Sequence, residues 1–364
     1  LGILGIFAGD LTSVPMLELP GYATSLLVFS YALIGAWGIL AFAARKSKGV
    51  YVAQWYILAA LFWFPWIYVI AQFFVVWFPA RGVVQAIAST WYAYNLQNLW
   101  LMPMALATAF YVIPKVLGRP IHSYYLSVLG FSSLALIAPW TGMAHLTGGP
   151  ITIWMTSTGI VATVMMVIPL FSVVMNLFMT LLGSSGQAIW RSPALRFIVF
   201  GICAFLVFSL IDAVFALRSM SEVVHFTHFK QGVTQAAVYG FFGMVMFGGL
   251  YYMLPRLLKR EWPSAALIGV HFWGSAVGIS LIVIALLVGG WAEGVQMNDA
   301  SVPFAEIAQS MLPWLKARSV GTALLFVAHL ALAINFFWML LAPRSMNAKQ
   351  GPTLLQSANQ EGVA

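Results

Sequence analysis

The chain has 364 residues, of which 62% are hydrophobic and 15% aromatic, and its mean hydropathy is +0.93. Charged residues make up 7%, against about 25% in ordinary soluble domains. So few charges cannot cover a soluble fold of this length, which excludes soluble, disordered and fibrous proteins. The single cysteine, Cys203, excludes a disulfide framework and a cysteine-ligated cluster. In so apolar a chain the net charge of +8 reflects loop topology and does not indicate nucleic-acid binding.

Apolar segments long enough to cross a bilayer follow one another along the chain. Residues 1–8 read as the tail of a helix, so we expect an N-terminal portion to precede them. After 10–20, nine segments each reach the roughly 20 residues that a transmembrane helix needs. They cover 22–44, 52–79, 83–113, 122–144, 152–183, 195–217, 231–255, 264–291 and 313–342. Such continuous runs exclude an outer-membrane barrel and predict one all-α transmembrane bundle domain over 1–343, followed by a polar tail over 344–364.

The distribution of lysine and arginine predicts the orientation of the bundle. One side of the membrane collects 12 of these residues and the other 5, so the first side should be cytoplasmic. The chain is then a multi-pass protein of a bacterial-type inner membrane with a cytoplasmic C-terminus, and a long acidic loop over 292–312 faces the periplasm. The residues on the predicted cytoplasmic side are Arg45, Lys46, Lys48, Lys115, Arg119, Arg191, Arg196, Arg256, Lys259, Arg260, Arg344 and Lys349.

Polar residues inside the spans are candidates for function, because polar groups are costly at bilayer depth. Asn95 and Asn98 are three residues apart on one helix face, which fits either a ligand or proton site or hydrogen bonding between helices. His145, at the end of the fourth span, either binds a metal or haem or bonds to the backbone.

Two further places carry polar groups. Asp212, in the sixth span, either relays protons or pairs with a base such as Arg218. His225 and His228 lie beside Glu222 and form either a weak metal site or a wet periplasmic loop that caps the next helix. The remaining histidines give no metal-type spacing: His122, His271 and His329. Because phosphate loops, nucleophile triads and zinc motifs are also missing from the sequence, these patterns leave a redox subunit or a transporter.

Several motifs in fixed order resemble subunit I of the cbb3-type cytochrome c oxidases, within the haem–copper oxidase superfamily. They are FYVIPK at 110–115, GRP at 118–120, SY at 123–124, GFFG at 240–243, GLYYMLPRL at 249–257 and HFW at 271–273, with Arg318 and Asn335. The resemblance covers nearly the whole chain. It implies a fold of about twelve helices, of which nine full spans and the end of a preceding helix are present here.

The resemblance implies ligand positions that this sequence fills differently. The first copper-ligating histidine of the family falls on Asn95, and its histidine pair falls on Ala144 and His145. The His-x-His that binds both haems falls on Val233 and Gln235, and the active-site tyrosine on Phe205. Copper needs a compact set of imidazoles, and haem iron needs a lone pair that valine lacks. We therefore expect no catalytic residue and no metal site, with His145 as the only retained candidate for cofactor binding.

These expectations favour a degenerate subunit I, a pseudo-enzyme that serves as scaffold or docking subunit in a respiratory or electron-transfer complex. Its expected partners are other membrane and cytochrome c-type subunits and lipid, without nucleic acid. No cofactor is expected in this chain, and haem b only if a preceding helix and an alternative ligand supply it. The alternatives are an active terminal oxidase or nitric oxide reductase subunit that retains a haem, and a repurposed proton or ion pathway through Asp212, Asn95 and Gln97.

Overall fold

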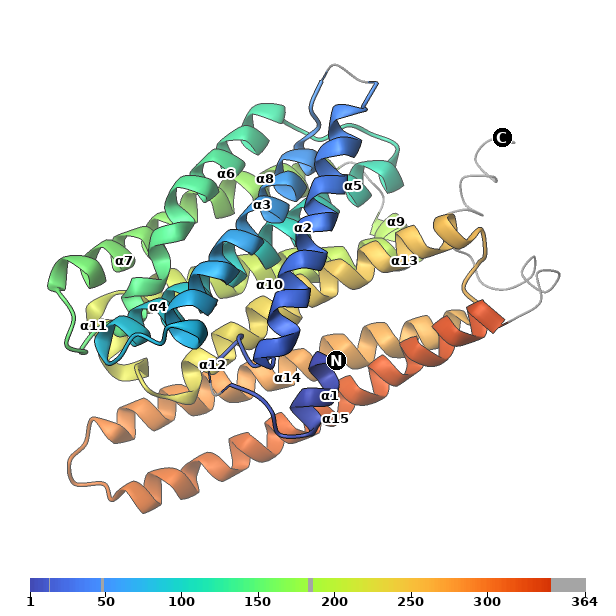
Figure 1. The fold of residues 1–364 in the computed structure, drawn as a ribbon. Coiled ribbons are helices and arrows are strands. Elements are labelled where there is room, and N and C mark those ends of the chain that lie inside the picture. Colours follow the sequence, from blue (N-terminus) through green and yellow to red (C-terminus); the bar gives the residue numbers. More distant parts are fainter. Residues whose placement is uncertain (13, 47–48, 183–185, 342–364) are drawn as a thin grey trace. The chain divides into compact units, whose positions relative to one another are not determined.

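The computed structural model describes residues 1–12, 14–46, 49–182 and 186–341, apart from the side chain of Gln187. Within these residues all regular elements are helices (Figure 1). They are α1 (Gly2–Phe7), α2 (Gly21–Ala43), α3 (Val52–Gln72), α4 (Val83–Asn95), α5 (Met102–Leu117), α6 (Tyr124–Ile137), α7 (Ile153–Met165), α8 (Val167–Leu181), α9 (Gly186–Arg191), α10 (Pro193–Phe215), α11 (Arg218–Val224), α12 (His228–Gln235), α13 (Met244–Leu258), α14 (Ala265–Met297) and α15 (Phe304–Leu341). The predicted tail 344–364 lies outside the described residues.

The predicted number of spans is confirmed. In the described part of the chain, nine helical stretches are long and apolar enough to cross a membrane. Some of them combine two α-helices: α4 and α5 are joined by the π-helical segment Leu96–Leu101, and α12 and α13 by Ala236–Gly243. The protein is a multi-pass membrane protein with an all-α fold.

The predicted acidic loop over 292–312 is wrong, because helix occupies most of that range. Helix α14 continues to Met297 and α15 begins at Phe304, which leaves only residues 298–303 between them. The carboxylate of Glu293 does not need solvent to satisfy it, since the side chain is buried and accepts a hydrogen bond from the His228 backbone N–H. Glu306 lies in the first turn of α15, where a negative charge favours the helix dipole.

The described residues group into two compact units. One comprises Leu1–Ala107 and Ser123–Val173, and the other Thr108–His122 and Val174–Ala364, of which residues up to 341 are described. The prediction of a single domain over 1–343 stays a prediction. In the first unit, the ring of Phe64 lies 4.4 Å from that of Tyr31 and 4.3 Å from that of Trp100. The Trp100 indole N–H donates to the Tyr31 hydroxyl at 2.6 Å, which satisfies its polar atom inside this aromatic core.

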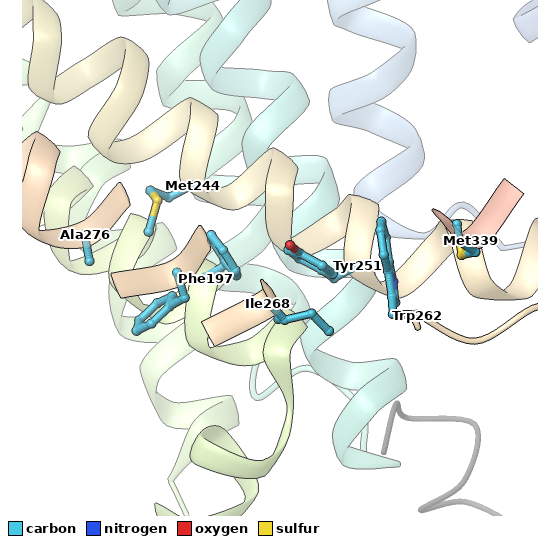
Figure 2. Close-up of a cluster of buried hydrophobic side chains, with 8 residues drawn as sticks. Phe197, Met244, Tyr251, Trp262, Ile268, Ala276 and Met339 are labelled. Carbon is cyan, nitrogen blue, oxygen red and sulfur yellow. The ribbon is translucent and has the colours of Figure 1, made fainter. Parts of the chain in front are cut away.

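The core of the second unit is a cluster of large side chains. Its buried members are Phe197, Met244, Tyr251, Trp262, Ile268, Phe272, Ala276 and Met339. Figure 2 shows the Tyr251 ring between Phe197 and Trp262, whose ring centroids lie 5.2 and 4.8 Å away. The cluster joins α10 and α13 to the long antiparallel pair α14 and α15, which run side by side (Figure 1).

Candidate functional site

The positions that the resemblance assigns to ligands fall in both units. In the first unit, Asn95 is the last residue of α4 and is completely buried. Its amide nitrogen donates to the carbonyl oxygens of Trp91 at 2.8 Å and of Pro139 at 3.4 Å. Asn98 donates to the Thr141 hydroxyl at 3.0 Å. The predicted hydrogen bonding between helices is therefore confirmed for both amides.

Ala144 and His145 lie in the 3₁₀-helical segment Ala138–Leu146, which follows α6. Ala144 is 5% exposed and packs on α7 at Gly159, where an added Cβ would collide with the Ala144 backbone. The His145 imidazole stacks on the ring of Tyr94, with centroids 3.9 Å apart and planes 6° from parallel. His145 therefore lies flat against an aromatic side chain of α4.

The second unit holds the remaining positions on α10 and α12. Val233 is 8% exposed and lines an apolar cavity of about 260 Å³ between α10, α12 and α14. The cavity wall is hydrocarbon except for the Cys203 thiol and the Ser280 hydroxyl. Gln235 is half-buried at the end of α12, and the Phe205 ring stacks on Phe241 with centroids 4.5 Å apart.

Several of the assigned positions lie in, or directly before, a departure from α-helix, whereas Phe205 lies within the regular helix α10. Asn95 immediately precedes the π-helical segment Leu96–Leu101, and Gln235 immediately precedes Ala236–Gly243. Ala144 and His145 lie in a 3₁₀ segment. Such irregularities are frequent at functional sites, since they re-aim side chains. Sequence reasoning missed both π-helical segments. Pro103 was a signal for the first, since in a regular helix its ring would clash with the carbonyl of Leu99, whereas Ala236–Gly243 contains no proline.

Two pairs of titratable side chains lie at the N-terminal end of α12 in the second unit. The Lys230 ammonium lies 3.7 Å from Asp212 Oδ1, so the ion pair of Asp212 is with Lys230 and not with the suggested Arg218. His228 Nδ1 lies 2.8 Å from Glu293 Oε2. The pairing favours a structural role for Asp212 over an isolated proton relay.

The loop before α12 caps that helix, as one of the two interpretations predicted. Thr227 accepts from the Phe229 N–H, and Glu293 accepts from the His228 N–H at 2.9 Å. Burial, together with the positive charge of Lys230, holds the pKa of His225 below its ordinary value of 6.5. The described residues contain no group of three or more His, Cys, Asp or Glu side chains that could hold a metal ion.

The structure also brings together two histidines that are 58 positions apart in the sequence. His271 of α14 and His329 of α15 have ring centroids 5.6 Å apart, and the Tyr251 hydroxyl lies 2.9 Å from His271 Nδ1. Local spacing could not reveal this pair, because it arises only from the packing of α14 against α15.

Comparison with known proteins identifies the family to which the chain is similar. The family model described as cytochrome c and quinol oxidase polypeptide I matches residues 2–324. The cbb3-type cytochrome c oxidase subunit CcoN1 of Stutzerimonas stutzeri is 28% identical over 306 residues, which cover 80% of this chain and 64% of that protein. Cytochrome c oxidase subunit 1 of Rhodobacter capsulatus is 27% identical over 322 residues, covering 84% of this chain and 60% of the relative.

A solved structure supports the same fold. A chain of a haem–copper terminal oxidase dimer, determined by cryo-EM, superposes with a TM-score of 0.64 at 15% sequence identity. The match covers 83% of this chain and 58% of that chain. The chain thus spans roughly three fifths of the length of these proteins.

Proposed function

The chain belongs to the cytochrome c and quinol oxidase polypeptide I family, as its motifs predict, and from this premise we propose that it lacks a haem–copper centre of its own. In this proposal it is a cytochrome c oxidase subunit I-like membrane subunit that acts as scaffold or docking subunit in a respiratory or electron-transfer complex. The observation that carries the proposal is the set of side chains at the assigned ligand positions.

The residues of the first unit do not fit copper. A carboxamide can bind a metal only through its oxygen, a hard donor that suits copper poorly, and the nitrogen of Asn95 donates to two backbone carbonyls. Ala144 offers a methyl group, which leaves His145 as the one imidazole at these positions. A copper site of this family type needs several imidazoles in a compact arrangement.

The residues at the assigned positions of the second unit do not fit a haem iron. Val233 presents hydrocarbon to an apolar cavity, and Gln235 could offer only a weakly binding amide oxygen. Phe205 has no hydroxyl with which to donate a proton. No step of oxygen or nitric oxide reduction is therefore assigned to these residues.

A scaffold role requires that the bundle hold together through its own side chains. The bonds of Asn95 to Pro139 and of Asn98 to Thr141 connect α4 to the segment that carries His145. In the second unit, stacking of Phe205 on Phe241 joins α10 to Ala236–Gly243. Small residues, amides and aromatic rings of this kind are what drives helix association in membranes. The proposed partners are other membrane and cytochrome c-type subunits, together with lipid.

Metal and haem analysis tests the absence of the centre. The complex would be purified through a tag on this chain, and haem (as the pyridine haemochrome) and copper would be assigned to its separated subunits. We expect no haem on this chain. Haem b and copper each at one per chain would overturn the proposal. The Stutzerimonas stutzeri relative, prepared in the same way, is the positive control.

Assembly tests the scaffold role. Deleting the gene for this chain should leave its partner subunits unassembled on native gels, and the wild-type chain should restore the complex. The double variant Asp212→Asn/Lys230→Met, which removes both charges of the ion pair and leaves neither unpaired, should restore it equally well, because a scaffold does not use a proton on this carboxyl. Normal assembly with loss of ion-coupled transport in this double variant would support the alternative proton or ion pathway instead.

A further inference from the structure

Two histidines lie next to each other at the interface of α14 and α15, and one of their ring nitrogens has no hydrogen-bond partner. His271 is completely buried, and its Nε2 has no hydrogen-bond partner. Its other ring nitrogen, Nδ1, lies 2.9 Å from the Tyr251 hydroxyl. The half-buried ring of His329 faces it at 5.6 Å between centroids. A buried imidazole nitrogen without a partner is costly, and a ligand bound to it would remove that cost.

Close packing of the two helices creates this pair. At Gly274, one turn after His271, an added Cβ would lie 2.9 Å from the Cβ of Ala328. At Gly278 it would lie 2.9 Å from the carbonyl oxygen of Gly321. Since His329 directly follows Ala328, the approach that these small residues permit brings both imidazoles to one level of the helix pair.

The hydrogen bonds around the pair match those of metal-binding histidines. A metal-ligating imidazole usually has its second nitrogen held by a protein group, which fixes tautomer and orientation. Here Tyr251 holds His271 and the Leu325 backbone bonds to His329. In the tautomer where His271 Nδ1–H donates to the Tyr251 oxygen, Nε2 keeps a free lone pair. Two metal–nitrogen bonds of about 2 Å each place the nitrogens about 4 Å apart. Rings separated by 5.6 Å can meet that requirement.

The side chains around His271 and His329 limit the charge and the coordination number of a metal ion that could bind between them. No third His, Cys, Asp or Glu in the described part of the chain completes a group here, so the site offers two neutral ligands. A divalent ion without an anionic ligand is strongly disfavoured in a buried site, because the free-energy cost of burying an ion rises with the square of its charge. The Phe247 ring lies 4.6 Å from His271 and 5.3 Å from His329, where an aromatic face can stabilise a cation. We propose that His271 and His329 bind one soft monovalent cation, Cu(I), in a two-coordinate site within the second unit.

Competition with a chromophoric Cu(I) chelator tests the site. The full chain, in the complex with which it purifies, would be titrated anaerobically with Cu(I), and with Ag(I) as a redox-inert probe. We expect one tightly held ion per chain, and its loss in both His271→Ala and His329→Ala. His122→Ala, which changes an exposed histidine elsewhere, should bind as the wild type does. Tyr251→Phe should weaken binding by about 10- to 100-fold, as loss of a supporting hydrogen bond does.

Further measurements keep the test decisive. Thermal unfolding and gel filtration would establish that each variant folds, and His271→Gln replaces His271→Ala if the cavity in the latter prevents folding. X-ray absorption should report two nitrogen ligands on the bound ion. The proposal is overturned if the wild type holds Cu(I) no more tightly than the His271→Ala/His329→Ala double variant. Copper that persists together with haem b in that double variant would instead contradict the proposed function, so the two failures are distinguishable.

Discussion

The amide of Asn95 connects two helical segments from a position where the family is expected to carry a copper ligand. Its nitrogen donates to the Pro139 carbonyl of the neighbouring segment and to Trp91 in its own helix. Asn95→Ala leaves the Pro139 carbonyl without this donor and opens a small cavity, which should cost about 1–3 kcal/mol of unfolding free energy. Thermal unfolding in detergent would measure the loss. Gln97→Ala, at a half-buried amide two residues away, should cost clearly less, and equal effects would argue against a special role of Asn95.

His225 predicts how stability depends on pH. The pKa of His225 is held below its ordinary value of 6.5 in the folded chain. Just below pH 6.5, the unfolded chain therefore binds more protons at this residue than the folded chain does. The unfolding free energy must therefore fall as the pH falls through this window. Replacing the imidazole by an amide in His225→Gln removes this contribution, so the variant should lose less stability than the wild type between about pH 8 and about pH 5. Melting temperatures across this range test the prediction, which an equal or steeper loss in the variant would contradict.

At the scale of elements, the close packing of α14 against α15 requires glycine at one position of α14 and not at another. A Cβ at Gly278 would lie 2.9 Å from the Gly321 carbonyl oxygen, whereas one at Gly269 meets nothing within 4 Å. Gly278→Ala should push the helices apart and cost about 1–3 kcal/mol. Gly269→Ala should be neutral or stabilise α14 by up to about 1 kcal/mol, since alanine favours helix. Thermal unfolding of both variants gives the comparison, and a stable Gly278→Ala would show that the helices tolerate a wider spacing.

The elements themselves could be predicted from apolar runs, but their ends and irregularities could not. Hydropathy finds a span because about 20 apolar residues are needed to cross the hydrocarbon. It fails for 292–312, where polar residues such as Glu293 continue a helix because tertiary partners satisfy them. It also fails for Leu96–Leu101, where the hydrogen-bond register changes just before Pro103, whose ring in a regular helix would clash with the carbonyl of Leu99.

At the scale of the whole molecule, the sequence likewise predicts some features of the candidate site and misses others. Order and spacing of motifs identified the family, because those motifs are continuous in sequence. The Asp212–Lys230 pair and the His271–His329 pair join residues of different helices, so they depend on packing that one sequence does not reveal. Asp212 illustrates this limit, since Arg218 is nearer in sequence while Lys230 is the residue that pairs with it.

The orientation of the bundle is the remaining prediction at this scale, and it rests on the 12-to-5 division of basic residues. The single native cysteine allows a clean test, because Cys203→Ser gives a cysteine-free background. In that background, Ala300→Cys, between α14 and α15, should react with a membrane-impermeant maleimide added to intact cells. His122→Cys, between α5 and α6, should react only after the membrane is opened, because the basic side stays in the cytoplasm. The opposite pattern would invert the bundle and place the C-terminus outside.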